Sequence, residues 1–516
     1  MLMKYLKFTL SFFIISFSVM NAQTAPSIQW QKSLGGSSYD LAKSIQQTSD
    51  GGYIIAGESD SINEDVTGNH GTSDFWIVKL NALGIIEWQK SLGGSYSDMA
   101  NSIQQTSDGG YIVAGESSSI NGDVTGNHGN ADYWIVKLDP SGNIQWQKSL
   151  GGSNRDVANS IKQTSDGGYI VAGESSSNNG DVTGNHGNFD FWIVKLDPSG
   201  TIQWQKSLGG SLHDGANSIQ QTSDGGYIVA GGASSSNGDV TNNQGNDDFW
   251  IVKLDALGAL QWERSLIGNL ADTAQSIHQI EGGYIVTGPS NSQNSEVPTN
   301  FGISNYCVAK LDSNGNTVWQ KYFGGSNNDY PFSTQQTTDG GYIVAGGSQS
   351  LDGDVVGNHG NNDFWIIKLN SSGNLEWQKT LGGSAFEDAY SIKQTNDGGF
   401  VLAGMTQSAD GDVTGYHGNG DAWIVKLGAF LSTNESNIKN NVTIYPNPAK
   451  DFVNIDNLPS ESTISITDAT GRKISSKKYS EKNVSINTSG IINGNYIIQV
   501  ENQGTTILSK KIIISK

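Results

Sequence analysis

Carboxylates recur at fixed places in two glycine-rich phrases, and they are the side chains of this sequence whose type and spacing could do chemistry. The first phrase, G-G-S-x-x-D, ends in an acid seven times, at Asp40, Asp98, Asp156, Asp214, Asp272, Asp329 and Glu387. The second phrase, N-G-D-V-T-G-N-H-G-N-x-D, holds an internal acid at Asp65, Asp123, Asp181, Asp239, Glu296, Asp354 and Asp412. It ends on a further acid at Asp74, Asp132, Asp190, Asp248, Asp363 and Asp421. Oxygen-rich loops bent by glycine suit a hard cation such as calcium, or an acidic binding surface.

The same acids also have a purely structural interpretation. Neither phrase has the D-x-D-x-D-G spacing of an EF-hand-like loop, and Asp side chains cap turns by accepting hydrogen bonds from backbone N–H groups. We therefore predict that most of these acids are turn caps and that no cofactor is needed, with calcium as the open alternative. The candidate ligand-binding face comprises eight of them, which are Asp40, Asp98, Asp156, Asp214, Asp65, Asp123, Asp181 and Asp239.

Histidine and cysteine are the other reactive side chains. The loop histidines belong to five different copies of the repeat, at His70, His128, His186, His359 and His417. A ring would hold them too far apart to share a metal, so no metal site is predicted. Cys307 has no paired histidine motif, which favours a buried thiol. Neither G-x-S-x-G nor H-E-x-x-H occurs, and we predict no catalytic residue.

The elements that position these loops come from one unit of about 58 residues, repeated seven times. The phrase W-Q-K-S-L-G-G, with variants, begins at Trp30, Trp88, Trp146, Trp204, Trp262, Trp319 and Trp377. A second tryptophan recurs at Trp76, Trp134, Trp192, Trp250, Trp365 and Trp423. Each copy holds four strand-like runs joined by turns such as Asp139-Pro140-Ser141-Gly142. This pattern predicts an all-β fold, a seven-bladed β-propeller over residues 24–428, in which the tryptophans are packing anchors.

The two ends of the repeat array indicate how the ring closes. The first copy begins with an extra strand at Ser27 to Lys32, whereas the last copy stops after Leu427 without one. The N-terminal strand is therefore expected to complete the final blade and to remove two exposed edges. The phrase from Trp134 to Asn143 and on to Trp146 resembles quinoprotein-like propeller repeats, which implies that the tryptophan strand is outermost. An open solenoid is the alternative, because period alone does not prove closure.

Strand direction predicts where the acids lie. Strands joined by hairpins alternate in direction, so the two tight turns of each copy belong to one end of the ring and the two acidic loops to the other. Copies five and six break the pattern, for example with Cys307 in place of tryptophan and with Tyr330-Pro331-Phe332. These breaks are either drift or an asymmetric ligand patch.

Charge and the N-terminal segment restrict location and partners. Residues 1–23 have Lys4 and Lys7, an apolar run and Ala22, as in a secretory signal peptide, with an N-terminal membrane anchor as the alternative. No other apolar window is long enough to span a bilayer, so no transmembrane segment is expected in the mature protein. The net charge of −20 argues against a nucleic-acid partner.

A separate unit follows a polar linker at residues 429–441. Residues 437–516 carry ten Lys and Arg against six Asp and Glu, a balance opposite to that of the acidic repeats. Their motifs are Tyr445, Pro446, Asn447, Pro448 and Ala449, then Gly471 and Arg472, Gly494 and Tyr496, and Lys510 and Lys511. In this order they resemble the type A C-terminal sorting domain of the type IX secretion system of Bacteroidetes. An ordinary adhesive β-sandwich is the alternative.

The resemblance implies a small C-terminal β-sandwich whose partners are the type IX secretion machinery and a sortase-like protease. It implies passage through the periplasm to the outer-membrane surface or the medium. We therefore expect a secreted or surface-displayed propeller that acts as a non-enzymatic binding or adhesion module for an extracellular glycan or protein. The alternatives are an extracellular polysaccharide-acting enzyme and a structural surface-coat protein.

Overall fold

The structure is a computed structural model, and it describes residues 25–243, 246–266, 268–292, 302–429, 442–468, 472–502 and 505–516. In this part of the chain all regular elements are strands. The predicted signal peptide, Gly471 and all but the first residue of the predicted linker lie outside it. The predicted domain boundaries at these segments stay predictions.

Seven four-stranded antiparallel sheets account for residues 28–427 of the described chain. The innermost strands are β2 (Asp40–Gln47), β6 (Asp98–Gln105), β10 (Asp156–Gln163), β14 (Asp214–Gln221), β18 (Ser276–Ile280), β22 (Asp329–Gln336) and β26 (Glu387–Gln394). The second strands are β3 (Tyr53–Ser59), β7 (Tyr111–Ser117), β11 (Tyr169–Ser175), β15 (Tyr227–Ala233), β19 (Gly283–Ser290), β23 (Tyr342–Ser348) and β27 (Phe400–Thr406).

Two further strands complete each sheet on its outer side. The third strands are β4 (Asp74–Leu80), β8 (Asp132–Leu138), β12 (Asp190–Leu196), β16 (Asp248–Leu254), β20 (Asn305–Asp312), β24 (Asp363–Leu369) and β28 (Asp421–Leu427). The outermost strands are β5 (Ile86–Leu92), β9 (Ile144–Leu150), β13 (Ile202–Leu208), β17 (Leu260–Leu266), β21 (Thr317–Phe323), β25 (Leu375–Leu381) and β1 (Ile28–Leu34).

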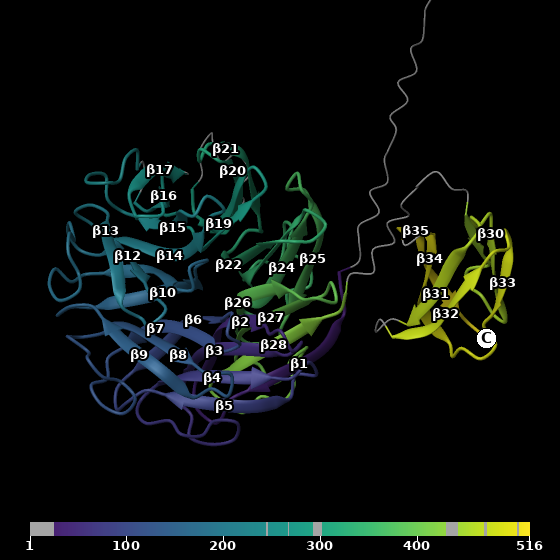
Figure 1. Cartoon of the computed structure of the whole chain (residues 1–516), viewed down its shortest axis with the longest axis horizontal. Helices are drawn as coiled ribbons and strands as arrows, with labels where there is room; N and C mark the ends of the chain where they lie inside the picture. The colour runs from purple at the N-terminus through teal and green to yellow at the C-terminus, as the bar shows by residue number, and fades with distance from the viewer. Residues whose placement is uncertain are drawn as a thin grey trace, which may run out of the picture.

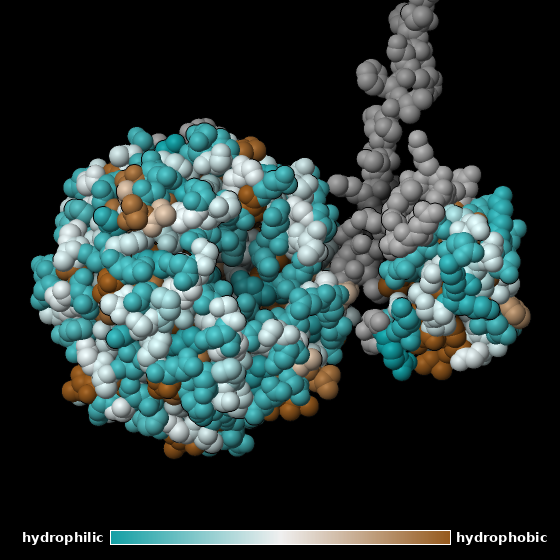
Figure 2. Space-filling model, viewed as in Figure 1, coloured by the Kyte–Doolittle hydropathy of each residue, from teal (hydrophilic) through white to brown (hydrophobic). Residues whose placement is uncertain are grey.

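The sheets form a closed ring around a central hollow (Figures 1 and 2). Each blade packs on the next, and β27 of the last blade contacts β2 of the first. The N-terminal strand β1 pairs antiparallel with β28, with Gln31 opposite Val425 and Ser33 opposite Trp423. The seven-bladed propeller, its closing strand and the outermost tryptophan strand are therefore confirmed, and the open solenoid is wrong.

The core lies between neighbouring blades, which explains why one residue pattern repeats in every copy. Strands two and three read as continuous apolar runs because both faces of each blade are covered. At one boundary Trp134 packs on Phe75 of the preceding blade, with ring centroids 4.5 Å apart. Cys307 fills the slot of this tryptophan in copy five and is fully buried, and burial raises the pKa of its thiol. A buried, protonated thiol agrees with the predicted packing role.

The C-terminal unit has two sheets with one shared core. The first sheet has the order β29 (Thr443–Tyr445), β30 (Phe452–Asp456), β33 (Val484–Asn487). The second has the order β32 (Lys473–Tyr479), β31 (Ser462–Asp468), β34 (Gly494–Asn502), β35 (Thr505–Ile514). Val453 and Ile455 of the first sheet belong to the same buried cluster as Ile466 and Ile498 of the second. The predicted small β-sandwich is confirmed.

Candidate functional site

The two ends of the propeller differ as strand direction predicts. Tight turns close one end, where the Gly109 N–H donates to the Thr106 carbonyl over 2.9 Å. At the other end the two acidic loops of each copy bind each other, since the Asp123 N–H donates to the carbonyl of Gly93 over 2.9 Å. We call this second end the loop face.

The first acid of each copy lies inside the loop face rather than on it. Asp98 accepts hydrogen bonds from the Gly94 N–H over 2.8 Å, from the Ser119 hydroxyl over 2.8 Å and from the Ser117 hydroxyl. Burial raises the pKa of the Asp98 carboxyl, against these hydrogen bonds. The four predicted ligand-binding residues of this series are fully buried, at Asp40, Asp98, Asp156 and Asp214. Their assignment to a ligand-binding face is therefore corrected, because they cap the G-G-S turns from beneath.

The last acid of the long loop is buried as well, and it explains the loop histidines. Asp132 accepts a hydrogen bond from the His128 N–H over 3.0 Å and another from Nδ1 of the same histidine over 2.6 Å. Burial raises the pKa of Asp132 to about 6. The same pair occurs as His70–Asp74, His186–Asp190, His359–Asp363 and His417–Asp421. Each histidine is thus hydrogen-bonded through Nδ1 to the carboxylate that ends its own loop.

The internal acid of the long loop is the one that reaches solvent. Asp65, Asp123, Asp181 and Asp239 are half-buried, and each accepts a weak hydrogen bond from a loop glycine, such as Gly93 N–H to Asp123 over 3.2 Å. At the boundary between the third and fourth blades, Nε2 of His186 lies 4.0 Å from Oδ2 of Asp239. The loop face therefore presents an imidazole of one blade beside a carboxylate of the next.

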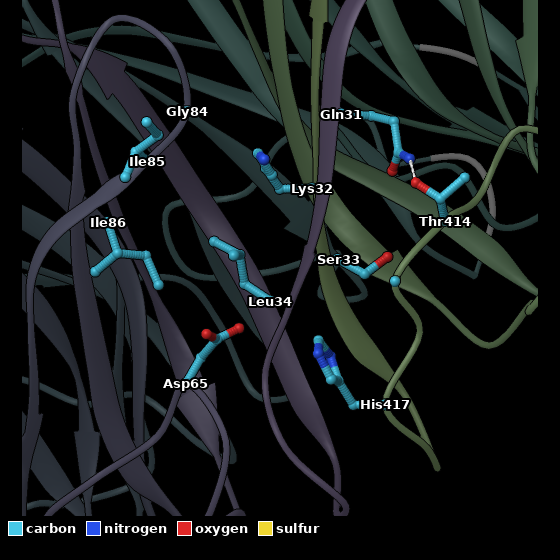
Figure 3. Close-up of a pocket in the computed structure, with 11 residues that line it drawn as sticks. Gln31, Lys32, Ser33, Leu34, Asp65, Gly84, Ile85, Ile86, Thr414 and His417 are labelled. Carbon is cyan, nitrogen blue, oxygen red and sulfur yellow. Dashed lines mark hydrogen bonds between the residues drawn. The ribbon is translucent and has the colours of Figure 1, made fainter.

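A groove of about 470 Å³ lies at the boundary where the last blade meets the first (Figure 3). Asp65 and His417 line it from the two blades, with Leu34 of β1 between them in the view. Lys32 of β1 and Ile86 of β5 also line the groove. This groove combines an acid, an imidazole and an ammonium group with an apolar wall, which suits a hydroxyl-rich or amide-rich ligand.

Side chains that break the repeat gather at the mouth of the central channel. Nζ of Lys43 lies 4.0 Å from the ring centroid of Tyr390, which packs on Phe332 with centroids 5.0 Å apart. Nearby in the ring, Arg155 binds Glu116 over 2.7 and 2.9 Å, and both line a cavity of about 360 Å³. Sequence reasoning named only Phe332 of this cluster, although a column-by-column reading of the inner strands shows lysine, asparagine, glutamine and aromatic residues at its position.

Asp388 occupies a position of the inner strand that is apolar in most copies, and it provides a test of pH dependence. It is 7% exposed, its Oδ1 accepts a hydrogen bond from Nδ2 of Asn362 over 2.8 Å, and burial raises its pKa to about 7. A carboxyl with a raised pKa holds its proton more tightly in the folded state than in the unfolded state. Its contribution to stability is complete below pH 4, near the unfolded pKa, and is lost as pH rises through the folded pKa of about 7. Asp388→Asn should therefore match the wild type at pH 4 and exceed its stability by about 4 kcal/mol at pH 8.

Chemical unfolding at pH 4, 6 and 8 measures this difference. Asp410→Asn is the matched control, since Asp410 is exposed on the same blade and Asn121 fills the equivalent position of the second copy. If the difference between Asp388→Asn and the wild type did not change with pH, the pKa of this carboxyl would not be raised in the folded state.

The first motif of the C-terminal unit is hydrogen-bonded to the last strand, and the other motifs have local partners. The segment from Tyr445 to Pro448 is exposed, whereas Ala449 is buried and its N–H donates to the carbonyl of Ile513 over 2.7 Å. The Ile513 N–H in turn donates to the side-chain oxygen of Asn447 over 2.8 Å. Arg472 pairs with Asp468 over 2.9 Å, and the Tyr496 hydroxyl donates to the carbonyl of Ile492 over 2.9 Å. Lys510 lies on β35, and its Nζ donates to the carbonyl of Ile444 over 3.4 Å.

Comparison with known families identifies this unit. Residues 443–515 match the family described as the secretion system C-terminal sorting domain. The unit is therefore a sorting domain of the type IX secretion system, and it carries the chain to the cell surface or out of the cell in contact with the secretion machinery. Over the residues that the structure describes, there is no helix long and apolar enough to cross a membrane. The chain thus combines a seven-bladed β-propeller with a C-terminal sorting domain of the type IX secretion system.

Similarity over the propeller itself is distant. The chain is 22% identical over 427 residues to the regulatory protein FlaEY of Caulobacter vibrioides, which covers 72% of this chain and 43% of that protein. Among solved structures it is similar to PorZ, a surface component of the type IX secretion system of Porphyromonas gingivalis, with 13% identity and a TM-score of 0.40 over 95% of this chain and 61% of PorZ. It is also similar to the WD40 domain of Neurospora crassa Pan2, with 11% identity and a TM-score of 0.44 over 77% and 95% of the two chains.

Proposed function

We propose that this protein is a non-enzymatic binding or adhesion module, displayed on or released from the cell surface, which engages an extracellular glycan or protein through its loop face. The observation that carries the proposal is the pairing of a half-buried carboxylate with the imidazole of the neighbouring blade at His186 and Asp239. At another blade boundary, His417 and Asp65 line one groove. A Bacteroidetes source and a signal peptide over residues 1–23 remain predictions.

Repetition supports a binding role more than a catalytic one. The ring presents the same kind of boundary several times, whereas a reaction needs one specialised constellation. Several weak sites on one rigid ring bind a repeating polymer with an avidity far above the affinity of each site. An extracellular polysaccharide or a matrix protein with repeated motifs is a ligand of this kind.

Binding of the secreted chain to arrays of polysaccharides and matrix proteins tests the proposal. Changing Asp65, Asp123, Asp181 and Asp239 together to Asn should weaken binding at least tenfold, because the charges of these half-buried carboxylates are removed while the shape of the side chains is kept. The matched control changes Asp139, Asp197, Asp255 and Asp312 to Asn in the tight turns of the opposite end, where Asn81 and Asn370 occur naturally. Equal binding by both variants would refute a ligand site on the loop face.

Calcium is expected to have no effect on folding. The buried acids of the G-G-S phrase, such as Asp98, are satisfied by hydroxyl and N–H donors. Among the described residues no three acid, histidine or cysteine side chains are grouped to hold a metal ion. The melting temperature should therefore agree within about 1 °C in calcium and in chelator. A clear rise with calcium would instead make the loop acids cation ligands.

An enzyme is the second candidate, favoured by the cluster at the channel mouth. Glu58 lines the cavity there beside Lys43, and burial raises its pKa, as expected of a general acid. In that case Glu58→Gln should abolish turnover of a polysaccharide while Asp123→Asn should not. If the wild type bound a polysaccharide without turning it over, the adhesion module would be favoured. If it neither bound nor turned over any polysaccharide, a surface-coat protein would be favoured.

A further inference from the structure

The central channel is ringed by one side chain from each of the seven innermost strands, all at the same position in the repeat. These side chains are Gln46, Gln104, Lys162, Gln220, His278, Gln335 and Lys393. Together with a few neighbouring residues they line a cavity of about 260 Å³. Neither the sorting domain nor the loop face accounts for this ring.

The four glutamines are held in one orientation. Oε1 of Gln46 accepts a hydrogen bond from the backbone N–H of Gln105 over 2.8 Å, and Oε1 of Gln104 accepts one from Gln163 over 2.7 Å. Gln220 and Gln335 bind the next inner strand in the same way, over 2.8 and 2.9 Å. Only the oxygen of an amide can accept from an N–H, so the side-chain NH₂ group is the end left over. Within the described residues these four NH₂ groups have no acceptor, and they add only donors to the channel wall.

The two lysines of the ring lack the partners that other lysines of the propeller have. Lys137 pairs with Asp108 over 2.9 Å, and the same pair recurs in five more blades, for example between Lys195 and Asp166. Lys162 and Lys393 have no carboxylate within ion-pair distance among the described residues, and both line the cavity. Both lysines are half-buried, and two cations that face one channel without a counter-charge repel each other. This arrangement stands out in a chain with a net charge of −20.

The pKa directions agree with this geometry. Burial lowers the pKa of Lys393 to about 8, and the charge of Lys162 adds to the effect. Burial, followed by the charges of both lysines, lowers the pKa of His278 to about 3, so this imidazole is neutral at pH 7. The ring therefore has two ammonium groups and four amide donors around one cavity.

We propose that the central channel binds a small oxyanion, a phosphate or a carboxylate, between Lys162 and Lys393. Charge-assisted hydrogen bonds from the two ammonium groups would carry most of the affinity, and the amide NH₂ groups of the glutamine ring would satisfy the remaining oxygen lone pairs. The cavity has room for one such anion. The site is independent of the proposed binding role of the loop face.

The test uses the full mature chain and the variant Lys162→Gln/Lys393→Gln. Glutamine is the residue of four other copies and can accept the hydrogen bond from the next strand, so the variant is expected to fold. Sodium phosphate and sodium acetate are titrated against sodium chloride of equal ionic strength, by thermal unfolding and by calorimetry. The wild type should show a saturable rise in melting temperature with phosphate or acetate that chloride does not give, and the variant should bind at least tenfold more weakly.

The matched control is Lys148→Gln/Lys206→Gln, which removes the same charge from outer strands. It should bind the anion like the wild type. The single variant Lys393→Gln provides the same comparison if the double variant is poorly folded. The proposal is overturned if the wild type responds to phosphate and acetate only as it responds to chloride, or if the channel variants and the control respond alike. Binding of phosphate alone or acetate alone supports the proposal and shows which oxyanion shape the ring prefers.

Discussion

A chain that ends at residue 428 is expected to be made and folded but not exported, with at least a tenfold loss of protein from the cell surface and the medium. The reason is that the sorting domain and the propeller are built as separate units. The propeller has its own closed core between blades, and the C-terminal sandwich has its own core from Ile444 to Ile514. Removal of residues 442–516 therefore takes away the export signal and leaves the propeller complete. Fractionation of cells, periplasm and medium measures the distribution.

The reciprocal experiment is the control for this prediction. Residues 429–516 placed after an unrelated folded periplasmic protein should carry that protein out of the cell. Within the sorting domain, Ala449→Asp should also block export, since Ala449 is fully buried and its N–H pairs with the last strand. Efficient export of the truncated chain would contradict the assignment of the tail.

Removal of the N-terminal strand, residues 25–36, should lower the melting temperature by about 10 °C or more, the effect of losing several kcal/mol from a domain of this size. Strand β1 forms the whole outer edge of the last blade, and its Gln31 side chain accepts a hydrogen bond from the Trp423 indole N–H over 2.7 Å. Without β1 the strand β28 becomes an exposed edge, so the truncated protein should also self-associate. Thermal unfolding and light scattering measure both effects.

A synthetic peptide of residues 25–36 is the control for closure. Added in excess, it should occupy the edge of β28 and restore most of the lost stability, because the pairing needs no covalent connection. A scrambled peptide of the same composition should restore nothing. Unfolding that is unchanged by the truncation would mean that the last blade does not depend on its outer strand.

The loop face shows how far sequence reasoning reached. The repeated phrases predicted which end of the ring holds the acids, since strand direction follows from counting hairpins. They did not predict which acids are buried, because Asp98 meets its hydroxyl partners, Ser117 and Ser119, only when the second strand folds back beside it. The pairing of His186 with Asp239 also needs two different blades in contact.

What the sequence by itself determined is the architecture: seven repeats, four strands in each, the closing strand and a tail that carries a sorting domain. Local patterns suffice for these, since alternation, turn residues and family motifs are read within a few tens of residues. Tertiary structure alone decided the sites. Ring closure brings Lys162 and Lys393, which lie 231 positions apart in the sequence, to one cavity, where no carboxylate of the described chain pairs with them. It also buries half of the predicted ligand face, because burial depends on which loops cover an acid and not on the phrase that contains it.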